Sequence, residues 1–134
     1  MPFEVFSRRS VSRTKTPMIT IQRRGNMSWN ASAAALITGI DDLEAMQEVP
    51  LELLYDRESK LVGVRKAKAD TINTYKMRKQ KNADSFLLAG KMFTGFYGID
   101  TEESRKFRAR DLGDGIIGFG LDDEHVTVSR EGGT

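Results

Sequence analysis

The hydrophobic and polar positions in the first half of the chain predict a strand, a short helix and a β-hairpin, in that order. Residues 18–23 alternate apolar and polar side chains, as a half-buried strand does. Asn30 is a preferred N-cap residue before an alanine-rich stretch, which predicts a helix over residues 31–37. Two apolar runs, 51–55 and 61–65, are joined by five polar residues and therefore predict a hairpin.

The second half repeats this order. Residues 74–79 and 85–88 predict strands, residues 89–97 predict a helix, and residues 105–110 and 116–121 predict a returning pair of strands. One copy would expose an apolar sheet face that two copies can cover for each other. The sequence therefore predicts an α+β, sheet-dominated fold of two pseudo-twofold strand–helix–hairpin halves.

This order also predicts the organisation of the chain. Residues 1–17 are expected to be a basic N-terminal arm, and residues 18–121 a single domain with halves 18–68 and 71–121. Residues 122–134 are expected to be a loose acidic tail. In the second predicted helix, an apolar stripe is expected in the core or, alternatively, at a dimer seam. The stripe consists of Met92, Phe93, Phe96 and Tyr97.

Charge is arranged in blocks, although the formal net charge is only +2. Residues 1–24 hold six Lys/Arg and one Glu, and residues 60–81 hold eight Lys/Arg and one Asp. Residues 41–58 hold seven acids and one Arg, and residues 111–134 hold six acids and one Arg. Such blocks can build a positive face for nucleic acid, or they can form salt bridges between neighbouring strands.

Several motifs that could carry chemistry favour structural interpretations. Residues 113–118 match G-x-G-x-x-G, but a strand-like stretch follows where a dinucleotide site needs a helix, so a turn is expected. The acids around His125 and the pair Asp41–Asp42 are expected to be solvated loops. With no cysteine and a single histidine, the sequence predicts neither an enzyme nor a metal or other cofactor. Trp29 could stack on a base, but a core position is favoured.

The segment from residue 18 to residue 66 resembles the AbrB/MraZ/SpoVT family of transcription factors. The resemblance lies in a strand running into Arg23-Arg24-Gly25, the step Met27-Ser28-Trp29, a small helix, and a hairpin with residues 56–58 at its tip. It implies a swapped-hairpin, cradle-loop barrel that binds DNA through basic residues on loops and strand ends. The proline that usually enters the family's helix is missing near Asn30, and the linker to the hairpin is longer and more acidic.

The element order of the whole chain also resembles the TATA-binding-protein fold, which implies a curved sheet that sits on DNA. The overall outline is similar to that of uncharacterised actinobacterial and phage proteins, a likeness that implies no function.

We therefore expect a non-enzymatic DNA-binding or transcription-regulatory module, homodimeric and cytoplasmic, with no membrane segment and no small-molecule substrate. Gln22 and Gln80 are expected at base edges. The alternative is a protein-interaction adaptor, possibly of phage type, that acts through the acidic segment 41–58 and its hairpin. The expected nucleic-acid-binding residues are Arg8, Arg9, Arg13, Arg23, Arg24, Arg78, Lys79 and Lys81.

Overall fold

The computed structural model describes residues 16–80 and 85–128, and over these residues the fold is α+β and dominated by strands. The three helices are short, and the longest has eight residues. The strands are β1 (Met18–Ile21), β2 (Met27–Asn30), β3 (Leu51–Asp56), β4 (Leu61–Lys66), β5 (Arg78–Lys79), β6 (Ser85–Leu88), β7 (Ser104–Arg108), β8 (Arg110–Gly113), β9 (Ile116–Gly120) and β10 (His125–Val128), and the helices are α1 (Ala31–Thr38), α2 (Leu43–Met46) and α3 (Lys91–Phe96).

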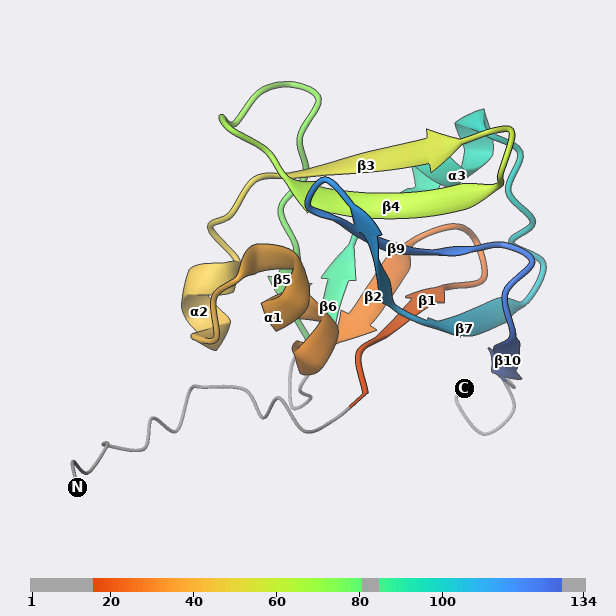
Figure 1. Cartoon of the computed structure of the whole chain (residues 1–134), viewed down its shortest axis with the longest axis horizontal. Coiled ribbons are helices and arrows are strands. Elements are labelled where there is room, and N and C mark those ends of the chain that lie inside the picture. The colour runs from red at the N-terminus through yellow and green to blue at the C-terminus, as the bar shows by residue number, and fades with distance from the viewer. Residues whose placement is uncertain (1–15, 81–84, 129–134) are drawn as a thin grey trace.

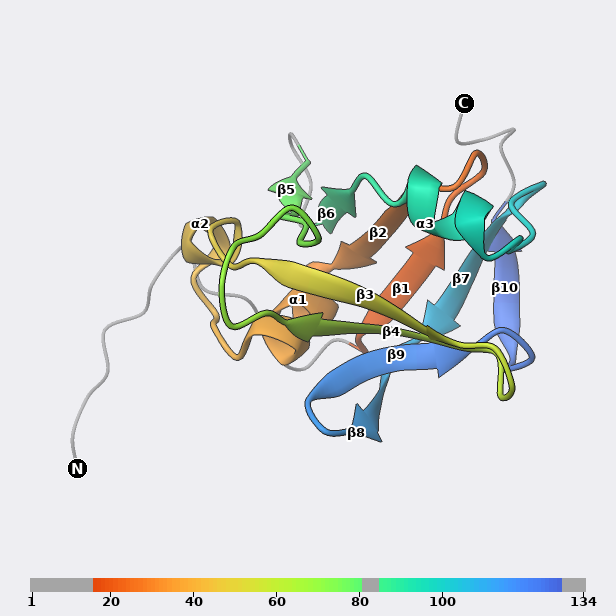
Figure 2. The same cartoon turned by 90° about the horizontal axis from the view of Figure 1, so that it is seen from above.

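The strands form two antiparallel sheets that lie one over the other (Figures 1 and 2). The six-stranded sheet has the order β10-β7-β1-β2-β6-β5, and the four-stranded sheet has the order β3-β4-β9-β8. Between β7 and β8, a single residue, Ala109, separates a strand of one sheet from a strand of the other. The described strands are not closed into a barrel, which corrects the cradle-loop-barrel alternative.

Each sheet contains two pairs of strands that are consecutive in the chain. In the six-stranded sheet, β1-β2 and β5-β6 meet where β2 pairs with β6, and β7 and β10 extend the sheet beyond β1. In the four-stranded sheet, β3-β4 and β8-β9 meet at the central β4–β9 pair. Each half therefore begins with two paired antiparallel strands, which the sequence predicts for the second half but not for the first, where it predicts a single strand. β2 was not predicted, although its residues alternate: Met27 and Trp29 are buried, whereas Ser28 and Asn30 are not.

Two other strand predictions need correction. The strand expected over residues 74–79 is reduced to the two residues of β5. The loose tail expected from residue 122 is wrong for His125–Val128, which pair with β7 as β10. Pairing partners far away in the chain decide both differences, and a local hydrophobic pattern does not contain them.

The core lies between the two sheets. Trp29 is buried, as predicted, and its Nε1 donates a hydrogen bond of 3.0 Å to Sδ of Met77. Phe107 of β7 stacks on Phe119 of β9 with ring centroids 4.2 Å apart, so this pair joins one sheet to the other. Burying an aromatic side chain of this kind contributes on the order of 3 kcal/mol, and the inward rows of both sheets supply most of the core.

Helix α1 packs against both sheets because its small side chains allow close approach. Ala33, Ala34 and Ala35 are all buried. The helix begins at Asn30, whose side chain accepts a hydrogen bond from the Ala33 N–H, and ends at Gly39, whose φ of 72° suits glycine. The predicted helix and both of its ends are confirmed.

Asn30→Ala is expected to lower the free energy of unfolding by about 2 kcal/mol, the upper end for loss of an N-cap. The Asn30 amide also accepts from the Met18 N–H at 3.1 Å and donates to the Thr16 carbonyl at 2.8 Å, so the change removes three contacts. Urea unfolding measures the loss. Asn73→Ala, the same change at an exposed loop position, is the control, and an equal loss in both variants would contradict this role for Asn30.

The apolar stripe of α3 is divided between two environments. Phe93 is buried and Tyr97 is half-buried, and both rings contact Tyr55 of β3. Met92 and Phe96 are 84% and 73% exposed, which corrects the expectation of a single core stripe. Residues four apart share a face of a helix, so each pair lies on a face of its own and only one face of this short helix meets the sheets.

No helix in the described segments is long and apolar enough to cross a membrane.

Candidate functional site

The six-stranded sheet has one face in the core and one face toward solvent. Its pairings place six residues in one row across the outward face, and none of them is buried. The row, from β5 to β10, is Arg78, Leu87, Ser28, Thr20, Lys106 and Val126. The neighbouring row faces inward and carries the buried rings of Phe86, Trp29 and Phe107. We refer to the outward side as the outer face.

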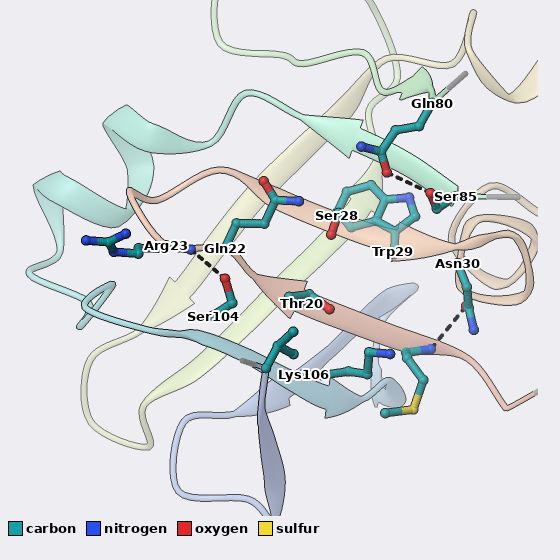
Figure 3. Close-up of a pocket in the computed structure, with 12 residues that line it drawn as sticks. Thr20, Gln22, Arg23, Ser28, Trp29, Asn30, Gln80, Ser85, Ser104 and Lys106 are labelled. Atoms are coloured by element: carbon teal, nitrogen blue, oxygen red, sulfur yellow. Dashed lines mark hydrogen bonds between the residues drawn. The ribbon is translucent and has the colours of Figure 1, made fainter. Parts of the chain in front are cut away.

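A shallow groove of about 450 Å³ lies on the outer face, and its floor is rich in hydroxyl and amide groups. Arg23 lies at one end and Asn30 at the other, with Thr20 and Ser28 between them (Figure 3). Within the described residues, the hydroxyls of Thr20 and Ser28 have no hydrogen-bond partner, so both can serve a bound molecule. The lining residues with polar side chains are Thr20, Gln22, Arg23, Ser28, Asn30, Gln80, Ser85, Ser104 and Lys106. The buried Trp29 also borders the groove.

Charge differs sharply between the two sheets. The six-stranded sheet carries Arg78, Lys79, Arg105, Lys106 and Arg108 in its strands, and these strands contain no Asp or Glu. The strands of the four-stranded sheet carry three cations and three acids. Thus one sheet is cationic and the other is balanced, and three of the five cations in the cationic sheet, Arg105, Lys106 and Arg108, lie outside the basic blocks of the sequence.

Three of these cations, Arg78, Lys106 and Arg108, are exposed. Lys106 pairs with Thr20, and Arg108 pairs with Met18 at the end of the same side of β7. Among the described residues, none of the three lies within salt-bridge distance of a carboxylate. A second hollow, of about 430 Å³, extends from Lys106 to Arg108. Two carboxylates border it, that of Asp123, which forms a salt bridge with Arg110, and that of Glu124.

Arg23 and Arg24, both predicted site residues, lie in the turn between β1 and β2, and both are exposed. The Arg23 N–H donates to the Ser104 hydroxyl at 2.9 Å, and Arg23 borders the groove. The Arg24 N–H donates to the Thr101 carbonyl, and Arg24 is outside the groove lining. The turn therefore presents one of the two arginines to the outer face.

Arg78 and Lys79 lie on opposite sides of β5. Arg78 belongs to the outer face, whereas the Lys79 N–H donates to the Gln47 side chain beside α2. Lys76, two residues before Arg78, forms a salt bridge of 3.2 Å with Asp70. Of Lys76, Arg78 and Lys79, only Arg78 therefore contributes a cation to the outer face. The remaining predicted residues, Arg8, Arg9, Arg13 and Lys81, lie outside the described residues.

Lys106 and Arg108 were missed by the sequence-based site prediction. They alternate with Phe107 and Ala109, both of which are buried. Because side chains of a strand point alternately to its two faces, this alternation was the available signal for two outward cations. Gln22 and Gln80, predicted at base edges, both border the groove, and Gln80 accepts from the Ser85 hydroxyl at 2.6 Å.

The acidic cluster 122–125 has a structural role through Asp123. Its carboxylate accepts from the Gly120 N–H at 2.9 Å and from Nε of Arg110 at 3.1 Å, and so holds the turn that leads into β10. These contacts, first the Gly120 N–H and then the Arg110 guanidinium, hold the pKa of Asp123 below its ordinary value of 3.8. Within the described residues, no group of three or more potential ligands could hold a metal ion.

Because of Asp123, the free energy of unfolding is expected to decrease as the pH is lowered. Its pKa is lower in the folded than in the unfolded chain, so its contribution is present above pH 3.8 and is lost as the pH falls through the folded value. In Asp123→Asn, the free energy of unfolding should decrease less than in the wild type when the pH is lowered from about 5 to below 3.8. Urea unfolding at each pH measures this free energy. Asp122→Asn, at an exposed neighbour, should leave that pH dependence unchanged, and the same flattening in both variants would contradict the assignment.

Other acidic residues also have partners within the chain. Asp42 accepts from the Glu44 N–H at the start of α2, and Glu52 forms a salt bridge of 2.9 Å with Arg65. Asp56 accepts from two N–H groups of its own hairpin loop.

The G-x-G-x-x-G match at residues 113–118 lies in the β8–β9 hairpin, as the turn interpretation predicted.

The outer face combines exposed cations with hydroxyl and amide groups, the kinds of side chain that bind anions. No protein-family model matches this chain, and searches of curated proteins and of solved structures return no match either.

Proposed function

We propose that this protein is a non-enzymatic DNA-binding module that contacts the phosphate backbone across the outer face of the six-stranded sheet. One observation carries the proposal. Arg78, Lys106 and Arg108 reach one face of a sheet whose strands contain no acid, and no carboxylate among the described residues pairs with them. Such cations bind phosphates with release of counterions, which supplies most of non-specific affinity for DNA.

The spacing of the cations supports an extended ligand. Arg78 and Lys106 occupy the same row with three strands between them. Four inter-strand steps correspond to about 19 Å. A single small anion could not contact both residues, whereas a polyanion with many phosphates can. The hydroxyls of Thr20 and Ser28 lie between the two cations, where they can donate to phosphate oxygens.

Base stacking is not supported at this face. The aromatic residues in the strands of the six-stranded sheet, Trp29, Phe86 and Phe107, are all buried. Proteins that bind single strands commonly stack bases on exposed aromatic side chains. We therefore propose double-stranded DNA, bound through its backbone, with Gln22 and Gln80 placed where they could reach base edges.

Fluorescence anisotropy with a labelled duplex of random sequence tests this proposal. We expect binding at ~50 mM salt that weakens steeply as salt rises, because counterion release drives phosphate binding. A labelled single strand of the same length should bind more weakly. Absence of duplex binding at ~50 mM salt, where such binding is strong, would refute the proposed function.

A further inference from the structure

The two edges of the six-stranded sheet differ in how well they are protected against pairing with another strand. At one edge, β5 has only two residues, Arg78 and Lys79, and both are cationic. At the other edge, β10 has four residues and contains no Lys, Arg, Asp, Glu or Pro. Short edges and charged side chains are the usual protection against strand addition, so β5 is a protected edge and β10 is not.

The side chains of β10 also remain accessible. All four residues are exposed, and Val126 and Val128 are 61% and 37% exposed. Within the described residues, β10 pairs with β7 on one side and with no strand on the other. Alternate residues of an edge strand direct N–H and C=O groups away from the sheet, where they can pair with another chain.

We propose that β10 is the dimer interface of this protein, and that it pairs antiparallel with β10 of a second copy. The strand is self-complementary in a register centred on Thr127. Val126 of each copy then lies opposite Val128 of the other copy, which gives two valine pairs on the outer face. Thr127 of one copy lies opposite Thr127 of the other. β-Branched cross-strand pairs of this kind stabilise sheets. β10 contains no Asp, Glu, Lys or Arg, so like charges do not meet at its centre.

The cationic residues do not oppose this arrangement. Lys106 lies on β7, next to β10 and level with Val126, so the two copies of Lys106 are three inter-strand steps apart and two residues apart along the strand, about 16 Å in all. That distance exceeds the Debye length of about 8 Å at physiological salt. Antiparallel pairing about a twofold axis normal to the sheet leaves both outer faces on the same side. The dimer therefore forms one continuous sheet with a doubled cationic surface.

Sedimentation of the full chain over a range of concentrations tests the interface. We expect a dimer, and Val126→Lys should raise its dissociation constant at least tenfold because a lysine on each copy would face the partner's valine. Met92→Lys is the matched control, since Met92 is also exposed but lies on α3. A monomeric wild-type chain would overturn the proposal, as would a dimer lost in Met92→Lys and retained in Val126→Lys.

Cross-linking tests the register. The chain has no cysteine, so a single introduced thiol gives an unambiguous product. Thr127→Cys should form an intermolecular disulfide under mild oxidation, because directly opposite strand residues have Cα atoms within the range that a disulfide spans. Val126→Cys should not form this disulfide, because position 126 of one copy faces position 128 of the other and the two introduced thiols are displaced by two residues along the strands. Equal cross-linking of both variants would refute the register. These outcomes do not depend on whether the protein binds DNA.

Discussion

Replacing Arg78, Lys106 and Arg108 together by alanine is expected to weaken binding to duplex DNA on the order of a thousandfold near 50 mM salt. Each phosphate contact contributes about 0.9 to the slope of log affinity against log salt. The variant should therefore lose about 2.7 from that slope as well as affinity. All three side chains are exposed, so their removal should leave the fold intact. Fluorescence anisotropy in a salt series measures both quantities.

The control for this experiment removes the same charge from the other sheet. Lys60, Lys66 and Lys68 are exposed on and beside the β3–β4 hairpin, and replacing them by alanine lowers the net charge by the same three units. If DNA binds at the outer face, this control keeps most of its affinity and its salt slope. Equal losses in the two variants would mean that net charge, and not the outer face, governs binding.

Gly118→Ala is expected to lower the free energy of unfolding by about 3 kcal/mol or more, the range in which overpacking becomes severe. Gly118 lies in β9 opposite Gly63 of β4. A Cβ atom at Gly118 would overlap the Val62 carbonyl oxygen and would lie 2.9 Å from Cα of Gly63. Because these are backbone atoms, no side-chain rotation can relieve the clash, and the central pair of the four-stranded sheet must separate.

The fluorescence of the single tryptophan, Trp29, reports this loss during urea unfolding because the residue is buried in the native state. Gly95→Ala serves as the matched control. Gly95 lies within α3, and a Cβ atom there would meet nothing within 4 Å. That change is expected to stabilise the fold by about 0.5–1 kcal/mol, because alanine loses less backbone freedom in a helix than glycine does. A Gly118→Ala protein as stable as the wild type would contradict the close contact.

Local patterns in the sequence were sufficient for much of the fold. The alternation in residues 18–23, the two apolar runs of the 51–66 hairpin, and the Asn30 cap followed by Gly39 each correspond to an element of the structure. The α+β, sheet-dominated class follows from these elements. Each signal is contained within a few neighbouring residues, because side-chain alternation and helix capping depend on the local backbone.

Only the tertiary structure decided which strands pair and in what register. It made residues 125–128 a strand through their pairing with β7, and it turned Met92 and Phe96 away from the core. It also brought Arg78 into one row with Lys106 across strands that are distant in the chain. Register is set by contacts between segments far apart in sequence, and those contacts determine which cations share a face. The charge blocks were visible in the sequence, but they did not identify the cationic sheet, because Lys106 and Arg108 lie outside them and reach the outer face through the pairing of β7 with β1.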